Sequence, residues 1–423
     1  MTAFRVPAGR VARGAIAVPP SKSVSHRYFN LTLLSRSRVS IERSLEAEDL
    51  TLFGRCLEQV GFESCEDGVT TTWVPLTRTP TSAEIDCGNA GTMYRFLLAA
   101  LTTIAGEWVL TGKPRLFDRP VGALIDALRN LGARIDCPRR EGYGPVHIHG
   151  GTLRGGSVEI DASESSQYVS ALLMAACGAS EPVEITVKSL SSSPYLDLTL
   201  DALSRFGAHV DRPAEDRFSV RPQELGSAGV RVEGDYSAAS YPASAAALTG
   251  GRVCLEGLRQ HSKQGDRRFL SLLEQLGAQA EWTDRGLEIS GSLERAIDVD
   301  LSDMPDQVPT LAALAPFLAG TTAIRNVAHL RLKESDRLAV MARELRRTGA
   351  KVDELDDGLV IEGIWAESSP PDSEVEIDPE DDHRIAMSMA LVGLRRPGIV
   401  IRHPEVVAKS YPHFWRDLET LVR

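Results

Sequence analysis

The residues best suited to chemistry occur in short segments that place cations among small polar side chains where helices are expected to begin. In the segment PSKSVSHR, Lys22 and Arg27 flank Ser23 at the entry to a nearly apolar helix. Cations are poor core residues, but opposite charges about 4 Å apart attract by roughly 4 kcal/mol at an effective dielectric of about 20. The segment therefore indicates a partly desolvated helix start that an anion joins, with a solvated helix start as the alternative.

Further segments in the first half of the chain have the same character. In DCGNAGTMYRF, Gly91 and its small neighbours let the backbone approach a ligand closely. A later helix start carries more hydrogen-bonding side chains than one cap requires, namely Ser165, Ser166 and Gln167. Additional donors nearby in the sequence are Ser192, Tyr195 and Arg119. For Arg119, which precedes a surface helix, an exposed arginine without a ligand is an equally good interpretation.

The second half of the chain contributes most of the titratable groups. They are Asp306 in DMPDQVP, Lys333, Glu334 and Arg337 in RLKESDRL, His383 and Arg384 in DDHRIAM, and Lys409 in AKSYP. Such a mixture suits proton transfer beside an anion, because cations hold the ligand while carboxylates move protons. KESDRL alone also fits a solvated helical turn with internal ion pairs. Its position in a repeat, described next, favours a substrate site over a solvated turn.

Two families of repeated helices must position these groups. One is amphipathic and ends in glycine about every 70–75 residues, at Gly61, Gly132, Gly207, Gly277 and Gly349. Each glycine is predicted to cap its helix in the left-handed region. The other family comprises six Ala-rich, nearly apolar helices, each after a β-type run and each starting with Ser, Gly, Thr or Asp. Their polar starts are expected to form anion sites, since helix N-termini present free N–H groups and a positive dipole end.

The repeats predict the architecture. Six units of strand, buried helix, strand, surface helix and strands are too large for one core, so we expect two domains of three units, divided near residues 233–235. The net charge of −11 argues against binding to nucleic acid or anionic lipid. No apolar run is long enough for a signal peptide or a membrane span, which predicts a cytoplasmic protein. The six cysteines show no metal-ligand spacing and are expected to be buried, reduced thiols.

Taken together and in order, the segments resemble the 5-enolpyruvylshikimate-3-phosphate synthase family of enolpyruvyl transferases. The resemblance runs along essentially the whole chain and rests on PSKSVSHR, GNAGT with a following Arg, DRPVGALIDALRNLGA, SSQYVSALLMAA, EGDYSAASY, KESDRL, DHRIAM and AKSYP. It implies an α/β fold of the two-domain enolpyruvyl transferase type, each domain made of three βαβαββ units with buried parallel helices. The implied domains are residues 21–233, and residues 1–20 together with 234–423.

The resemblance also implies a division of roles. Shikimate 3-phosphate would be held by Lys22, Ser23, Arg27, Ser165, Ser166, Gln167, Ser192, Tyr195, Asp306, His329 and Lys333. Phosphoenolpyruvate would be held by Lys22, Asn89, Gly91, Arg119, Gln167, Arg337, Arg384 and Lys409. Asp306 and Glu334 would transfer protons, with Lys22 as an acid or electrostatic partner. The anion site would lie between the domains, which substrate binding would draw together.

The implied reaction is addition followed by elimination, in which the 5-hydroxyl of shikimate 3-phosphate attacks C2 of phosphoenolpyruvate and phosphate then leaves. It requires no metal or redox cofactor and no partner beyond the two small substrates, and we expect a monomer. Two positions depart from the family, since His329 stands where Asn is common and Phe96 where Pro is usual. Gly91 leaves room for the inhibitor glyphosate in the phosphoenolpyruvate site, which predicts sensitivity.

Two other interpretations remain at this stage. The related transferase that acts on UDP-N-acetylglucosamine shares the fold, but it usually carries a catalytic Cys before its Arg-Pro region, and GKPRLFDRP contains none. A non-catalytic repeat scaffold would expose apolar or aromatic patches. Here the polar residues gather instead at the starts of the apolar helices.

Overall fold

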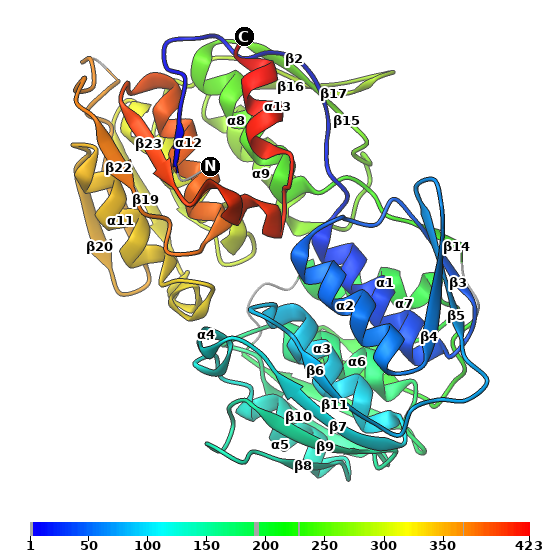
Figure 1. Ribbon diagram of the computed structural model, residues 1–423. Helices are drawn as coiled ribbons and strands as arrows, with labels where there is room; N and C mark the ends of the chain where they lie inside the picture. The colour runs from blue at the N-terminus through cyan, green and yellow to red at the C-terminus, as the bar shows by residue number, and fades with distance from the viewer. Residues whose placement is uncertain (1–2, 190–193, 227–228, 367) are drawn as a thin grey trace. The chain divides into compact units, whose positions relative to one another are not determined.

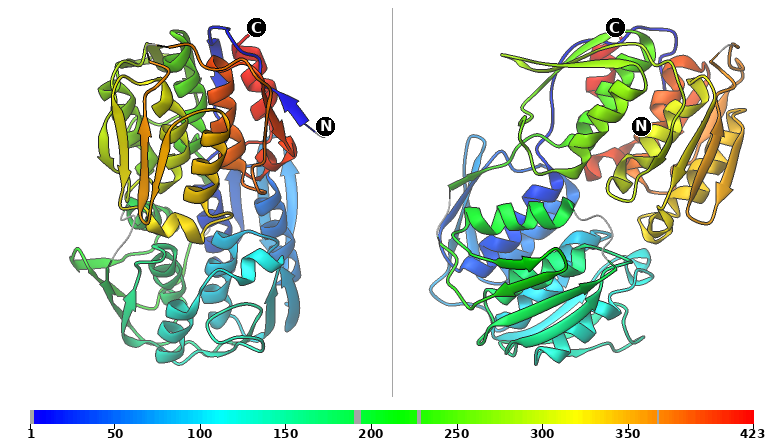
Figure 2. Two further views of the ribbon diagram at one scale, coloured as in Figure 1. Left: turned by 90° about the vertical axis from the view of Figure 1, so that its left-hand side faces the viewer. Right: turned by 180° about the vertical axis from the view of Figure 1, so that it is seen from behind.

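The computed structural model describes residues 3–189, 194–226, 229–366 and 368–423. The chain forms two compact units (Figure 1). Unit 1 comprises Met1–Pro19 and Glu233–Arg423, and unit 2 comprises Pro20–Val232. Each unit has its own apolar core. In both, sheets lie on the outside and a group of buried helices lies within, as two further views show (Figure 2).

Unit 2 contains three repeats of strand, buried helix, strand, amphipathic helix and hairpin. One repeat consists of β6 (Ser82–Asp86), α3 (Gly91–Ala100), β7 (Gly106–Thr111), α5 (Gly122–Asn130), β8 (Arg134–Asp136) and β9 (Val146–Gly150), with the short α4 (Pro114–Phe117) before α5. The next consists of β10 (Gly156–Asp161), α6 (Gln167–Ala176), β11 (Val183–Lys188), α7 (Pro194–Arg205), β12 (Asp211–Ala214) and β13 (Arg217–Val220). The third consists of β14 (Gly229–Arg231), α1 (Lys22–Ser35), β3 (Val39–Glu42), α2 (Glu48–Gln59), β4 (Phe62–Asp67) and β5 (Thr70–Pro75).

Unit 1 repeats the same plan. Its first repeat is β2 (Arg13–Ala17), α8 (Tyr236–Thr249), β15 (Arg252–Glu256), α9 (Arg268–Gln275), β16 (Ala278–Thr283) and β17 (Gly286–Gly291). The second is β18 (Asp298–Asp300), α10 (Val308–Leu314), β19 (Thr321–Arg325), α11 (Arg337–Arg347), β20 (Val352–Leu355) and β21 (Gly358–Glu362). The last is β22 (Val375–Ile377), α12 (His383–Arg395), β23 (Ile399–Arg402) and α13 (Phe414–Leu421), with β1 (Ala3–Arg5) in place of the hairpin.

The sheet pairing explains why each buried helix is fixed in direction. Each sheet holds one parallel pair, such as β6 with β7 or β18 with β19, and antiparallel strands complete it. A helix that joins two parallel neighbours must run antiparallel to both, so its N-terminus lies at the end where the first strand stops. At the two crossings between units, the parallel partner comes from far along the chain: β14 pairs with β3, and β2 with β15.

The predicted repeats are confirmed in their local detail. All five glycines that follow the amphipathic helices have positive φ, from 79° at Gly207 to 118° at Gly277. The six Ala-rich segments are the buried helices α1, α3, α6, α8, α10 and α12. In α8, every residue from Ala238 to Leu248 is buried, so small side chains are required for helices to pack on all sides of it.

The expectation for the cysteines is only partly confirmed. All six are free thiols, and Cys56, Cys87 and Cys177 are buried. Cys65 on β4 is exposed, because it lies on the solvent side of a strand whose residues after Phe62 are all exposed. Among the described residues, no helix combines the length and the apolar character that crossing a membrane would require.

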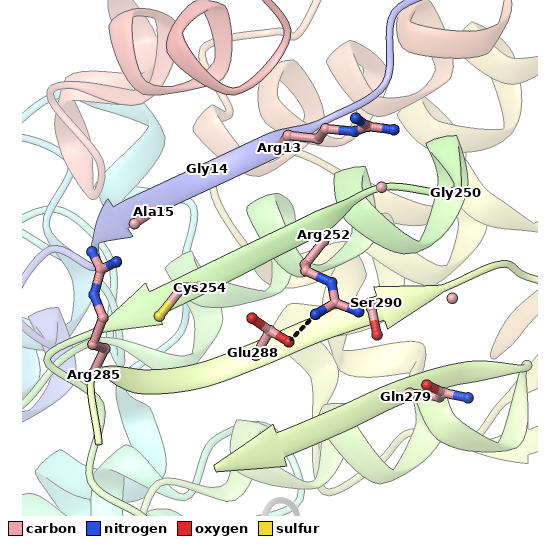
Figure 3. A pocket seen from close by; sticks show the side chains of 12 residues that line it. Arg13, Gly14, Ala15, Gly250, Arg252, Cys254, Gln279, Arg285, Glu288 and Ser290 are labelled. Atoms are coloured by element: carbon pink, nitrogen blue, oxygen red, sulfur yellow. Dashed lines mark hydrogen bonds and ion pairs between the residues drawn. The ribbon is translucent and has the colours of Figure 1, made fainter. Parts of the chain in front are cut away.

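A hollow on the outer face of the sheet formed by β16, β17, β15 and β2 is lined by polar side chains (Figure 3). Arg252 donates to Glu288 across the two central strands at 3.0 Å, and Arg285 lies 2.8 Å from Glu256. Ion pairs of this kind on an exposed strand face are ordinary surface features that contribute little to the stability of the fold. The candidate active-site residues lie elsewhere, most of them at or just before the starts of helices.

Candidate active site

Arg337 is the centre of a buried charged cluster in unit 1. It begins α11 and is only 2% exposed. Its Nε donates to Asp382 at 2.8 Å, its Nη1 to Asp306 at 2.9 Å and its Nη2 to Glu334 at 2.9 Å. Every nitrogen of the guanidinium therefore has a carboxylate partner, an arrangement with short, charge-assisted hydrogen bonds.

Two further cations complete the cluster. Arg384, in the first turn of α12, donates from Nη2 to Asp306 at 2.6 Å. The Nζ of Lys409 lies 3.4 Å from Glu334. Asp306 and Glu334 are thus each held between two cations, and charges alternate in sign along the row Arg384, Asp306, Arg337, Glu334 and Lys409. The residues that the sequence assigned to proton transfer and to anion binding in this unit lie together.

The electrostatics follow from this arrangement. Burial alone would raise the pKa of Asp306, but the positive charges of Arg384, Arg337 and Lys333 outweigh it and hold that pKa well below its usual range. Burial would lower the pKa of Arg337, yet Asp382, Glu334 and Asp306 together raise it above its normal value. At neutral pH Asp306 is therefore ionised and only a weak base.

Asp382 is a functional residue that sequence reasoning did not single out. It is fully buried, precedes α12 and accepts hydrogen bonds from the backbone N–H of Arg384 at 2.9 Å and from Ser335 Oγ at 3.2 Å, besides Arg337. It caps the helix and holds Arg337 and Arg384 in fixed positions. The signal was present, since DDHR places an acid at an expected helix start.

His329 lies at the edge of this cluster in a short 3-10 segment, Ala328–Leu332. Its Nε2 is buried and has no hydrogen-bond partner among the residues that the structure describes. Burial, reinforced by Lys333 and opposed by Asp306, lowers the pKa of His329 to about 4. The imidazole is consequently neutral at physiological pH, and like an asparagine side chain it can donate or accept a hydrogen bond without carrying charge.

In unit 2, the starts of α3 and α6 lie side by side. Gln167, the first residue of α6, donates from Nε2 to Thr92 Oγ1 in α3 at 3.0 Å and accepts from Arg95 Nη1 at 3.0 Å. Ser165 Oγ accepts from the backbone N–H of Gln167 at 3.3 Å, and Ser165 and Ser166 are both buried. Arg95 was not predicted as a site residue. It positions Gln167. The sequence could have indicated Arg95, because it follows Gly91 by four residues, about one helical turn.

Arg27 is also buried, with 2% of its surface exposed. It donates to the carbonyl oxygens of Ser23 and Tyr195 and to Thr199 Oγ1, each at 2.9 Å. Burial lowers its pKa to about 10, which still leaves it charged at neutral pH. Because these acceptors are neutral, the charge of Arg27 is not cancelled by them and stays available to attract an anion.

The remaining predicted residues of unit 2 lie near the same helix starts. Lys22 begins α1, and its Nζ is 3.7 Å from Asp49. Asn89 lies in the turn before α3 and is half-buried. A Cβ on Gly91 would lie 2.5 Å from Cζ of Arg119, so the glycine leaves the room that this buried guanidinium occupies. Ser192 lies outside the described residues.

The two units therefore differ in chemistry. Unit 2 gathers cations and neutral hydrogen-bond donors around helix starts, which suits the binding of anions. Unit 1 interleaves carboxylates with cations, which suits proton transfer next to an anion. Within the described part of the chain, no group of three or more His, Cys, Asp or Glu side chains has an arrangement that could hold a metal ion.

Comparison with known proteins gives a consistent result. The family model described as EPSP synthase (3-phosphoshikimate 1-carboxyvinyltransferase) matches residues 7–418. A protein of Methanoculleus marisnigri with the name 3-phosphoshikimate 1-carboxyvinyltransferase is 45% identical over 421 residues, which cover 96% of each chain. One of Syntrophobacter fumaroxidans with the same name is 42% identical over 421 residues, covering 97% of each.

The fold is also similar to that of solved structures. EPSP synthase of Acinetobacter baumannii superimposes with a TM-score of 0.81 at 29% sequence identity, covering 99% of this chain and 97% of that one. The predicted α/β fold class is therefore confirmed.

The cluster geometry predicts a large stability cost for removing Asp382. In Asp382→Ala, buried Arg337 loses a carboxylate and α12 loses its cap, so we expect the free energy of unfolding to fall by about 3–5 kcal/mol. Urea unfolding followed by circular dichroism measures this. Glu376→Ala, on the exposed side of β22, is the control and should change stability by less than about 0.5 kcal/mol. A loss at position 382 as small as that of the control would contradict the assigned role.

Proposed function

The chain belongs to the EPSP synthase family, and we propose from this that it transfers the enolpyruvyl group of phosphoenolpyruvate to the 5-hydroxyl of shikimate 3-phosphate and releases phosphate. The observation that carries the proposal is the cluster in which Asp306 and Glu334 are interleaved with Arg337, Arg384 and Lys409. Two anionic substrates and several proton transfers need this combination of cations and carboxylates.

Shikimate 3-phosphate is assigned chiefly to unit 2. The proposed contacts there are Lys22, Ser23, Arg27, Ser165, Ser166, Gln167 and Tyr195, with Ser192 beyond the described residues. Buried Arg27 supports this assignment, because its acceptors among the described residues are neutral and a phosphate supplies a counter-charge. From unit 1, the proposal adds Asp306, His329 and Lys333.

Phosphoenolpyruvate is assigned to cations of both units. Those of unit 2 are Lys22 and Arg119, with Asn89, Gly91 and Gln167 beside them, and those of unit 1 are Arg337, Arg384 and Lys409. Arg337 and Arg384 both donate hydrogen bonds to Asp306. A substrate anion competes with that carboxylate for the same guanidinium groups. Substrate binding thereby weakens the hold on Asp306 and makes it a stronger base when a base is needed.

The reaction then balances with the groups present. In the addition step, the 5-hydroxyl oxygen bonds to C2 of phosphoenolpyruvate and gives up its proton, while C3 gains a proton and becomes a methyl group. In the elimination step, the C2–O bond to phosphate breaks and C3 returns a proton. Asp306 and Glu334 are the proposed proton carriers, and Lys22 stabilises the charge or supplies a proton.

The acceptor specificity tests the proposal directly. We expect phosphate release from phosphoenolpyruvate with shikimate 3-phosphate as acceptor and none with UDP-N-acetylglucosamine. A coupled phosphate assay with both acceptors measures this. Release with the nucleotide sugar alone would assign the chain to the other enolpyruvyl transferase, and release with neither would overturn the proposal.

The two carboxylates should be essential for turnover. Asp306→Asn and Glu334→Gln keep the shape of each side chain but remove its basicity, so we expect kcat to fall by about 10²-fold or more. Circular dichroism and the unfolding midpoint check that each variant is folded. Asp298→Asn, an exposed aspartate of unit 1, is the matched control and should retain full activity. Turnover within a few-fold of the parent would remove that carboxylate from the mechanism.

Gly91 should control both phosphoenolpyruvate affinity and glyphosate inhibition. In Gly91→Ala, the new methyl group forces the Arg119 guanidinium away, and loss of one charge-assisted hydrogen bond raises KM for phosphoenolpyruvate roughly tenfold or more. The parent should be inhibited by glyphosate in competition with phosphoenolpyruvate, and the variant less strongly. Gly229→Ala, where an added Cβ meets no atom within 4 Å, is the control. An unchanged KM in Gly91→Ala would contradict the role given to Arg119.

A further inference from the structure

A fourth acidic side chain, Asp266, lies beside the cluster and has no part in the proposed mechanism. It belongs to the 3-10 turn η2 (Gly265–Arg267) and is 4% exposed. Ser237 Oγ, in the first turn of α8, donates to its Oδ2. Its Oδ1 has no hydrogen-bond partner, and no Lys or Arg forms an ion pair with it, among the residues that the structure describes.

The neighbour of Asp266 is Gln307, which follows Asp306 in the chain. Gln307 is fully buried, and in the described structure neither Nε2 nor Oε1 of its amide has a well-formed hydrogen bond. This amide is nevertheless close enough to interact with the Asp266 carboxyl. If Asp266 is ionised, Nε2 can donate to it, and if Asp266 is protonated, its Oδ1–H can donate to Oε1. The Gln307 amide can therefore form one hydrogen bond with Asp266 in either protonation state.

The charges around Asp266 come from other elements. Asp306 repels a negative charge at this position, and Arg384 attracts one. The arginines beside Asp266 in the chain are engaged elsewhere, since Arg267 donates to the carbonyl of Gln260 and Arg268 pairs with Asp303 at 2.9 Å. Burial, reinforced by Asp306, raises the pKa of Asp266 to about 6. Arg384 is therefore the cation that keeps Asp266 ionised, and the same arginine is assigned to bind substrate.

We propose that Asp266 is a positioning residue that takes up a proton when an anionic ligand engages Arg384, and that it thereby keeps Asp306 ionised. An anion at Arg384 cancels the charge that stabilised both carboxylates. One of the two carboxylates then gains a proton from solvent. It is Asp266, because Lys333 still stabilises a negative charge on Asp306, whereas Asp266 forms no ion pair with a Lys or Arg among the described residues. The proton forms an O–H bond at Oδ1 and returns to solvent when the anion leaves. This inference rests on the proposed function, since it assumes that Arg384 binds a substrate anion.

Sulfate binding to the whole protein measures the proton directly, because sulfate stays doubly charged from pH 6 to 8 and does not itself titrate. Calorimetry at pH 7 in two buffers of different ionisation enthalpy counts the protons taken up per sulfate bound. We expect the parent to take up a fraction of a proton per sulfate bound and Asp266→Asn to take up none. The asparagine is neutral both with and without sulfate, so this variant should bind sulfate at least as tightly as the parent. Asp303→Asn, a half-exposed neighbour, should behave as the parent does.

The pH dependence gives a second readout that a purely structural role would not change. Because protonation of Asp266 favours the anion, sulfate should bind the parent more weakly as the pH rises from 6 to 8, by up to about tenfold for each unit of pKa change on binding. Asp266→Asn should show no such change. Arg384→Gln should abolish the proton-linked binding.

Three results would overturn the inference. They are equal proton uptake by the parent and Asp266→Asn, no proton uptake by the parent, and sulfate binding that does not depend on Arg384. A failure of the proposed function is a different result, since it appears as absent turnover of the parent with shikimate 3-phosphate and phosphoenolpyruvate.

Discussion

Burial of Arg337 is the constraint on which the charged cluster of unit 1 depends. A guanidinium that is 2% exposed needs a counter-charge, and Asp382, Asp306 and Glu334 each accept from one of its nitrogens. The latter two carboxylates are also held by Arg384 and Lys409. Each charge is stable in the interior only because its neighbours are present. A change at one member therefore alters the protonation and position of the others, and such residues do not contribute additively.

This mutual dependence also connects binding with chemistry. In the proposed mechanism, the cations assigned to the anionic substrate are the same ones that pair with Asp306 and Glu334, the carboxylates assigned to proton transfer. In that mechanism a bound anion competes with Asp306 for Arg337 and Arg384, and we propose that this competition makes Asp306 a stronger base once the substrate is in place. Unit 2 has a different balance, because Arg27 and Arg95 donate to neutral oxygens and Gln167 is fixed by Arg95 and Thr92. The guanidinium charges of Arg27 and Arg95 are therefore not cancelled by these acceptors, whereas the cations of the unit 1 cluster are paired with carboxylates.

The parallel helices are the reason that both sets of residues gather. Each lies between strands that pair in parallel, which brings helix starts such as those of α3 and α6 to the same end of a unit. These helices are buried along their length, so small and apolar side chains predominate in them, and the polar groups of the candidate site that they carry lie in their first two turns. There, unpaired N–H groups and the helix dipole favour anions. The position of the site is thus a consequence of how the helices are packed.

The repeats, the glycine ends and the six buried helices could be predicted from the sequence, because helix periodicity and left-handed glycines depend on residues a few positions apart. The family segments also indicated Asp306, Glu334, Arg337 and Arg384. The sequence did not indicate Asp382 and Asp266, whose partners lie 45 and 29 residues away. It likewise missed Arg95, which is 72 residues from Gln167. Local spacing therefore determined the elements and the kinds of residue at their ends, whereas tertiary packing decided which charges meet, since burial and counter-charges come from segments far apart in the chain.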